Sequence, residues 1–188
     1  MRLEIHLKRL ISLLPSLDTL TRQFELTESP AFYRLFVRNY FSPHESSAAQ
    51  SREFARWNQD IPINTASLKY SRRELTSCAA SLNVNIGNII HEEDFHLLEY
   101  EVSDRTEYIP PRPCVCTIIA GDEEELYLPD RLLPCLDYIE KQGLRLAGDP
   151  FTSMLIVAGT PQGRVRFDEA WFPVEEVVKT PGQAEEVP

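Results

Sequence analysis

The chain runs twice through the same order of predicted elements, strand, helix, strand and strand, and this order constrains its fold more than any single motif. The first pass covers residues 31–41, 42–61, 66–75 and 81–92. The second covers residues 114–121, 128–144, 149–159 and 165–174. Two such β-α-β-β units predict an α+β domain with a pseudo-repeated antiparallel sheet, whose natural binding place is a central groove between the units.

The ends of the two predicted helices carry recognisable signals. Ser42 before Pro43 fits an N-cap with proline at the first helical position. Gly143 fits the residue just past the end of the second helix, although Pro134 interrupts its first turn. The last two strands of the second pass are predicted to form a hairpin around the turn TPQG.

The N-terminal stretch has a heptad pattern. Leucine or phenylalanine recurs every seven residues, with a second position four residues after each of the first three, at Leu3, Leu7, Leu10, Leu14, Leu17, Thr21 and Phe24. We expect a long helix over residues 1–29 that bends near Pro15. Two interpretations stay open: a linker helix that pairs two chains, or a helix packed on its own domain.

These patterns divide the chain into three parts. We expect a linker or dimerisation helix over 1–29, one globular domain over 30–178 and a flexible tail over 179–188. Within the domain, the two repeats span about 30–103 and 108–178.

The charge of the chain is unevenly distributed. The formal net charge is -10, and residues 1–29 contain four basic and four acidic side chains, so the whole excess lies in 30–188. A domain this acidic repels a phosphate backbone and favours cationic partners. No apolar run approaches the roughly 20 residues of a membrane span, and charges interrupt the first ten residues, so we expect a cytoplasmic protein without a signal peptide.

Metal and cofactor motifs are absent from the sequence. Cys114 and Cys116 share one face of a predicted strand without zinc-type spacing, which favours buried free thiols over a redox or metal role. His91 and His96 lack the H-E-x-x-H spacing and fall on opposite faces. The chain contains no nucleotide-binding glycine motif, so we expect no metal and no cofactor.

The predicted strand at 164–176 places a carboxylate on an apolar face. Counting by twos puts Glu169 between Phe167 and Trp171. A carboxylate in an aromatic groove is costly unless it is paired, and a bound donor or cation recovers part of that cost. Glu169 is therefore either the acid of a ligand pocket or an acid at a strand edge, in water or paired with a nearby arginine.

Several aromatic side chains are candidates for the wall of such a groove, although aromatic residues at strand and helix spacing are more often part of the core. They are Trp57, Tyr70, Tyr108, Tyr127 and Phe151. Tyr127 lies at the entry to the second helix, and Phe151 begins the strand whose hairpin partner carries Glu169.

Three segments resemble the GyrI-like effector-binding domain, which is the ligand-sensing half of many MerR-type and AraC-type bacterial transcription regulators. These segments are YIPPRPCVCTIIAGDEEE, LDYIEKQGLRLAGDPFTSMLIV and FDEAWFPVEE. The features that match the family are Pro113 to Gly121, Gly148-Asp149, Glu169, Trp171 and Pro173-Val174. The resemblance covers residues 30–178 and implies that Glu169 lies at the floor of the groove, with Trp171 as its aromatic neighbour.

The resemblance also implies partners, and the chain departs from the family in two places. The leading helix is similar to the one that joins such a domain to a DNA-binding head and pairs two chains into a homodimer. No helix-turn-helix precedes Leu3, so we expect DNA contact only through a head absent from this chain. Multidrug-sensing relatives place a further acid where this chain has Thr152 and Ser153.

Three classes of function remain open at this point. The leading one is the effector-binding domain of a bacterial regulator that senses apolar ligands, cationic ones included, with Glu169, Trp171 and the aromatic candidates as ligand contacts. The second is a GyrI-like hydrolase of small molecules, in which Glu169 acts as general base beside Tyr127 or Tyr108. The third is a protein-binding module that acts through its acidic surface.

Overall fold

The structure is a computed structural model that describes residues 4, 8, 11–12, 17–21, 23–40, 47–77, 82–122, 125–160 and 163–177. Its helices are α2 (Leu17–Leu20), α3 (Ala48–Asn58), α4 (Arg72–Thr76), α5 (Glu92–Leu97) and α6 (Leu133–Lys141), with short 3-10 turns η2 (Glu125–Tyr127) and η3 (Pro129–Arg131). Its strands are β1 (Glu25–Glu28), β2 (Phe32–Asn39), β3 (Thr65–Lys69), β4 (Asn85–His91), β5 (Thr106–Ile109), β6 (Pro113–Gly121), β7 (Leu144–Leu146), β8 (Phe151–Thr160) and β9 (Gly163–Glu176).

All strand pairs of the sheet are antiparallel, which confirms the predicted α+β class. The strand order is β1-β6-β9-β8-β3-β4-β2-β5, and β7 pairs with the end of β9. The predicted β-α-β-β order is interrupted by α4 between β3 and β4 and by β7 before β8.

The first pass differs from the prediction in two places. Helix α3 begins at Ala48, where Ser47 and Gln50 form a capping box, while the predicted cap at Ser42 lies outside the described residues. The strand predicted over 66–75 is wrong in its second half. It ends at Lys69, and α4 follows because the Ser71 hydroxyl accepts a hydrogen bond from the Glu74 amide.

The second pass follows the prediction more closely. Helix α6 has Pro134 within its first two positions, where proline is tolerated, and Gly143 follows its C-cap with a φ of +70°. The register between β8 and β9 runs to the pair Thr160 and Gly163, which confirms the predicted hairpin.

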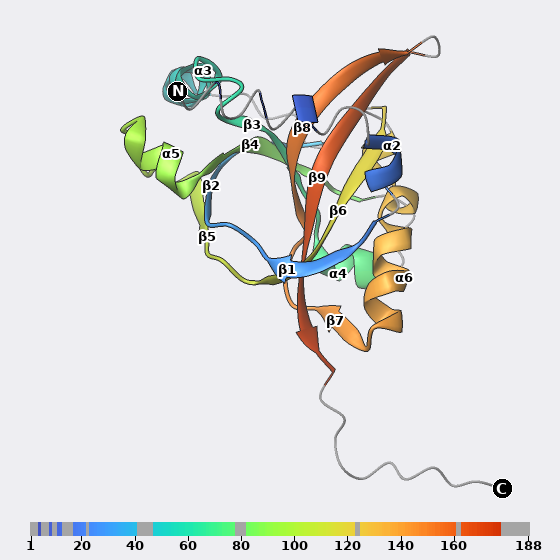
Figure 1. Ribbon diagram of the computed structural model, residues 1–188. Coiled ribbons are helices and arrows are strands. Elements are labelled where there is room, and N and C mark those ends of the chain that lie inside the picture. The colour runs from blue at the N-terminus through green and yellow to red at the C-terminus, as the bar shows by residue number, and fades with distance from the viewer. Residues whose placement is uncertain are drawn as a thin grey trace, which may run out of the picture.

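The outer face of the sheet, defined as the face that carries Leu35, Leu68 and Phe172, is covered by helices. Trp57 of α3 and Phe95 of α5 pack on Leu35. In the main core cluster, α4 and α6 pack against Leu68 of β3 and the outer-face residues of β6 and β9. The residues on the helix side are Leu75, Leu132, Cys135 and Ile139. Figure 1 shows α3 and α5 beside one end of the sheet and α4 and α6 beside the other.

The inner face, defined as the face that carries Phe32, Phe151 and Trp171, is strongly curved. Lys69 on β3 and Glu107 on β5 are separated by two intervening strands, yet the Lys69 ammonium lies 2.7 and 2.9 Å from the two carboxylate oxygens of Glu107. A flat sheet would hold strands this far apart at roughly 14 Å. The sheet therefore bends around its inner face (Figure 1).

Strands β1 and β5, at the two ends of the strand order, belong to one long two-stranded ribbon. The pairing of β1 with β6 and that of β2 with β5 have the same register, and the linkers between them are joined by a hydrogen bond from the Ser29 amide to the Arg112 carbonyl oxygen. Residues 25–35 thus run antiparallel to 106–116 and connect the two ends of the sheet.

This ribbon corrects the expected helix over residues 1–29. Glu4, Lys8, Ile11, Ser12 and α2 are helical, but residues 25–28 form β1 because they pair with β6. Leu20 packs beside Ile118 and Phe167, and the Phe24 ring stacks on Tyr138 at 5.0 Å, so these positions pack on their own domain. The other early heptad positions, Leu3, Leu7, Leu10 and Leu14, and Pro15 lie outside the described residues.

Candidate functional site

Strand β9 places Glu169 and Trp171 on the inner face, as the alternation of the sequence predicts. Glu169 lies opposite Ile118 of β6 and Ser153 of β8, whereas Trp171 lies opposite Cys116 and Phe151. The intervening Ala170 and Phe172 are buried on the outer face. Both faces of this strand are covered, so a one-residue slip would exchange the two sets of side chains.

An aromatic cluster surrounds Trp171. The Phe32 ring lies edge-on to Phe151, with a centroid distance of 5.8 Å, and lies 6.4 Å from Trp171 and 4.7 Å from the His91 ring. Trp171 is 6% exposed, and its Nε1 is buried without a hydrogen-bond acceptor among the described residues. Leaving such a donor unpaired costs about 1–3 kcal/mol.

Glu169 is half-buried, and hydroxyl groups lie near it on the same face. Its register partner Ser153 lies 2.9 Å from Thr65, oxygen to oxygen. The neighbouring residue Thr152 points to the outer face and donates to the Asp168 carboxylate at 2.6 Å. Ser153 and Thr152 therefore lie on opposite faces of the sheet.

A buried arginine on the inner face was missed by the sequence analysis. Arg34 donates from Nε to the Ser67 hydroxyl at 2.9 Å and from Nη1 and Nη2 to Asn85 at 2.6 and 2.7 Å. Burial lowers the pKa of Arg34 to about 10, although the negative charge of Glu107 acts to raise it. The sequence contained a signal for this residue. Arg34 follows Phe32 by two positions, as Glu169 follows Phe167, so alternation places its charge on an apolar strand face.

A buried charge pair, which the sequence analysis also missed, lies on the outer face. Arg166 and Asp168 are joined by two hydrogen bonds, and Asp168 has no exposed surface. Beside this pair lies Tyr70, whose hydroxyl donates to the Leu126 carbonyl oxygen at 3.0 Å. Burial raises the pKa of Tyr70 well above its usual value.

The seven predicted site residues do not form one group. Phe151 and Trp171 are brought together on the inner face, and Glu169 shares that face with them. Tyr70 lies in the outer-face core, and Tyr127 packs against that core and stacks on Tyr40 at 3.8 Å.

The other two predicted residues also lie on the outer side. Tyr108 is 45% exposed, and its ring lies 5.0 Å from the Tyr33 ring, while Trp57 of α3 is buried with its ring 4.8 Å from that of Tyr100. The structure thus does not bring Tyr127 or Tyr108 together with Glu169, which the hydrolase hypothesis required.

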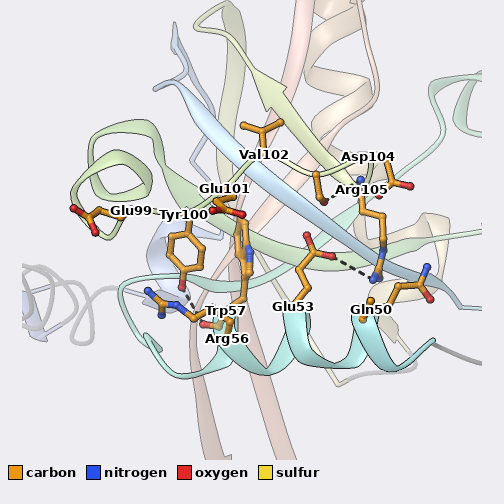
Figure 2. Close-up of a pocket in the computed structure, with 12 residues that line it drawn as sticks. Gln50, Glu53, Arg56, Trp57, Glu99, Tyr100, Glu101, Val102, Asp104 and Arg105 are labelled. Atoms are coloured by element: carbon orange, nitrogen blue, oxygen red, sulfur yellow. Dashed lines mark hydrogen bonds and ion pairs between the residues drawn. The ribbon is translucent and has the colours of Figure 1, made fainter.

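A pocket of about 580 Å³ lies between α3 and the segment 99–105 that follows α5, around the buried Trp57 (Figure 2). The Arg56 guanidinium lies 4.7 Å from the Tyr100 ring centroid and pairs with Asp60, which also accepts a hydrogen bond from the Tyr100 hydroxyl. Another hollow, of about 640 Å³, is lined mainly by apolar residues and by four prolines, Pro110, Pro111, Pro113 and Pro173.

Two negative findings apply to the described residues alone. Among them, no group of three or more histidine, cysteine, aspartate or glutamate side chains is close enough to hold a metal ion. His91 lies against Phe32 on the inner face and His96 lies against Tyr33 on the outer face, as the sequence analysis expected. In the same part of the chain, no helix is long and apolar enough to cross a membrane.

Comparison with known proteins identifies similar folds but no close relative. No family model and no curated protein sequence matches the chain. Among solved structures, the chain is similar to the C-terminal domain of EcmrR, with 18% identity over 82% of this chain and 98% of that chain and a TM-score of 0.49. It is also similar to a hydrolase encoded by lin2189 from Listeria innocua, with 15% identity over 82% and 92% and a TM-score of 0.49.

The chain is further similar to EcmrR in its cryo-EM complex with DNA. The identity is 17%, the match covers 91% of this chain and 70% of that chain, and the TM-score is 0.50. At this identity the likeness concerns the fold alone. The chain has the fold expected from the resemblance in its sequence, that of a GyrI-like effector-binding domain.

Proposed function

We propose that this chain is the effector-binding domain of a bacterial transcription regulator and that its ligand binds on the inner face beside Trp171. The observation that carries the proposal is the buried Trp171 Nε1, which has no acceptor among the described residues. A ligand with a hydrogen-bond acceptor at this position recovers the cost of the unpaired donor.

The surroundings of Trp171 define the rest of the ligand. Phe32 and Phe151 pack beside it as buried aromatic rings. Glu169 shares the face and lies two residues away along the strand, roughly 7 Å. A half-buried carboxylate at that distance favours a donor or a positive charge. The proposed ligand is therefore a flat apolar molecule that carries one acceptor and one donor or cationic group.

The strand order supports a groove between two repeated units. In the order β3-β4-β2 and in the order β8-β9-β6, the first strand of a pass lies next to the last strand of that pass. Two β-α-β-β units would produce this arrangement, with β3 and β8 at their junction. In this proposal the ligand lies over that junction.

The fold likeness supports a regulator as the context of the domain. The solved structure with a TM-score of 0.50 is a chain bound to DNA. In the proposal, DNA contact belongs to a part of the regulator other than residues 30–178, and the domain acts as a dimer. A domain of this kind shifts a dimer between two arrangements by at most the difference in ligand affinity between them.

The test uses the two tryptophans of the chain, since Trp171 lies in the proposed site and Trp57 lies elsewhere. In a Trp57→Phe variant, Trp171 alone reports binding by its fluorescence. We expect aromatic cations that carry a carbonyl group to quench it saturably, and a ligand at 100 times its Kd to stabilise the unmodified chain by about 2.7 kcal/mol.

Two matched variants decide the outcome. Glu169→Gln should weaken the binding of cationic ligands at least tenfold, while Glu175→Gln at the exposed end of β9 should leave it unchanged. If no compound from such a panel changes the Trp171 signal or the melting temperature, the inner face is not a ligand site and the proposal fails.

A further inference from the structure

We propose that the pocket between α3 and residues 99–105 is a second ligand site that binds a basic amino acid such as lysine. Its α-carboxylate would bind at Arg105, its α-ammonium group at Glu53 and its side-chain ammonium group at Glu101. This site lies on the outer side of the sheet and is independent of the inner face around Trp171.

Arg105 is the first observation behind the proposal. Its side chain is 10% exposed and lines the pocket. Nη2 donates to the Val37 carbonyl oxygen at 3.2 Å, but Nη1 is buried without a hydrogen bond in the described part of the chain. A guanidinium has five donors, and an unused buried donor is costly. A ligand carboxylate is the acceptor that suits it best.

Glu53 places a negative charge next to Arg105 in the pocket. Its Oε2 lies 3.6 Å from Arg105 Nη1, which is within reach of an ion pair but too far for a hydrogen bond. The two side chains thus present a positive and a negative group side by side in the pocket (Figure 2). The head of an α-amino acid carries the complementary pair, a carboxylate next to an ammonium group.

The other charged residues of the lining are Arg56 and three acids, of which Glu99 and Glu101 lie toward the Tyr100 end of the pocket and Asp104 lies beside Arg105 (Figure 2). Arg56 is engaged by Asp60, by the Leu98 carbonyl oxygen at 3.2 Å and by the Tyr100 ring. Within the described residues, Glu99, Glu101 and Asp104 make no ion pair. The lining therefore holds four carboxylates against two guanidinium groups, and a positively charged side chain is favoured.

The geometry favours an organic cation over a metal ion. No group of three metal-ligating side chains occurs in the described part of the chain, so these carboxylates are too dispersed to share one ion. Tyr100 and Val102 offer apolar surface in the lining, above the buried Trp57 (Figure 2). Methylene groups of a lysine side chain can pack there while the terminal ammonium group reaches the acids.

Fluorescence of a Trp171→Phe variant isolates this pocket, because Trp57 is then the one tryptophan of the chain. We expect L-lysine to change the Trp57 emission saturably. Cadaverine, which lacks the carboxylate, and norleucine, which lacks the side-chain ammonium group, should each bind at least tenfold more weakly. If cadaverine binds as tightly as lysine, the acids merely attract cations and the proposal fails.

Protein variants provide the second arm of the test. Glu101→Gln changes an exposed residue and should weaken lysine binding about tenfold, while Glu140→Gln on the exposed face of α6 serves as the matched control. Arg105→Gln should abolish binding, with its fold checked by circular dichroism. Unchanged lysine affinity in Glu101→Gln, or the absence of any lysine effect on the parent chain by calorimetry, would overturn the proposal.

Discussion

Arg166 donates to both carboxylate oxygens of Asp168, from Nε to Oδ1 and from Nη2 to Oδ2, with each distance 2.6 Å. Asp168 is fully buried and also accepts a hydrogen bond from Thr152 at 2.6 Å. Replacing it by asparagine leaves the Arg166 charge buried without a counter-ion. We expect Asp168→Asn to lower the free energy of unfolding by about 3–5 kcal/mol in urea denaturation.

An exposed pair at the other end of the same strand serves as the control. Glu175 accepts from Arg145 at 2.9 Å, and the two side chains are 47% and 60% exposed. Glu175→Gln should cost less than about 1 kcal/mol, since water screens this pair. Equal losses in the two variants would show that burial does not set the strength of these interactions.

Gly87 occupies a position where no side chain fits. A Cβ atom there would lie 2.1 Å from the Leu35 carbonyl oxygen and 3.0 Å from the Arg34 guanidinium, next to the register shift between β2 and β4. Gly87→Ala should therefore push the two strands apart and lower the free energy of unfolding by about 2 kcal/mol or more. Thermal melting monitored by circular dichroism measures the loss.

Gly159 on β8 is the matched control, because a Cβ atom there would meet nothing within 4 Å. Gly159→Ala should change stability by less than about 1 kcal/mol. A melting temperature of Gly87→Ala equal to that of Gly159→Ala would contradict the close approach of β2 and β4.

Helix α3 depends on its cap for stability. The Ser47 hydroxyl accepts from the Gln50 amide at 3.2 Å, and the Gln50 side chain accepts from the Ser47 amide at 2.9 Å. Ser47→Ala should cost about 1 kcal/mol, whereas Ser51→Ala inside the helix should be neutral or stabilising. Chemical denaturation of the two variants tests this, and a smaller loss for Ser47→Ala than for Ser51→Ala would refute the cap.

The buried thiol of Cys114 makes stability depend on pH in the alkaline range. Burial raises its pKa from 9.0 to about 11, although a hydrogen bond with Ser29 and the charge of Arg112 oppose the rise. The native state thus keeps the proton where the unfolded chain loses it. This contribution is complete below about pH 9 and is lost as pH rises toward 11.

The measurement compares the parent chain with Cys114→Ala at several pH values. The parent should be more stable at pH 8, and the difference should shrink by up to roughly 1 kcal/mol per pH unit above pH 9. Because other groups titrate in both proteins, the difference isolates the thiol. A difference that stays constant to pH 10.5 would mean that Cys114 titrates in the native state as it does in the unfolded chain.

The sequence predicted side-chain positions best in strands that are buried on both faces, because there the residues of the two faces alternate clearly along the chain. In β9 the alternation placed Glu169 and Trp171 on one side and Ala170 on the other, and the structure confirms this. The apolar run at 114–121 located β6, and the turn TPQG between two strand-like segments located the hairpin of β8 with β9.

Short strands could not be predicted from local sequence. Residues 25–28 read ELTE, with Leu26 as the single apolar side chain, and form β1 only because β6 offers an unpaired edge. Strand β5 at 106–109 depends on β2 in the same way. Propensity and periodicity contain no information about such distant partners.

The candidate site was predictable for residues on one strand but not for those brought together by the chain path. Phe151 and Trp171 meet because β8 and β9 form a hairpin. Tyr127 was favoured because it lies at the entry to the second helix, and Tyr108 was a candidate as an aromatic residue, but the face on which each lies depends on packing that no local pattern records. Arg105 and Glu53 meet through a contact between residues 52 positions apart.

The bent ribbon of residues 25–35 and 106–116 has a consequence for how the chain folds. Its paired residues lie between 71 and 91 positions apart in the sequence, and they join the two ends of the sheet. Bringing such distant stretches together costs loop-closure entropy before the contacts can repay it, and folding rates fall as contacts become less local. The ribbon is therefore expected to form late, as is the similarly distant pairing of β3 with β8, and until it forms the chain exposes the unpaired edges of β2 and β6.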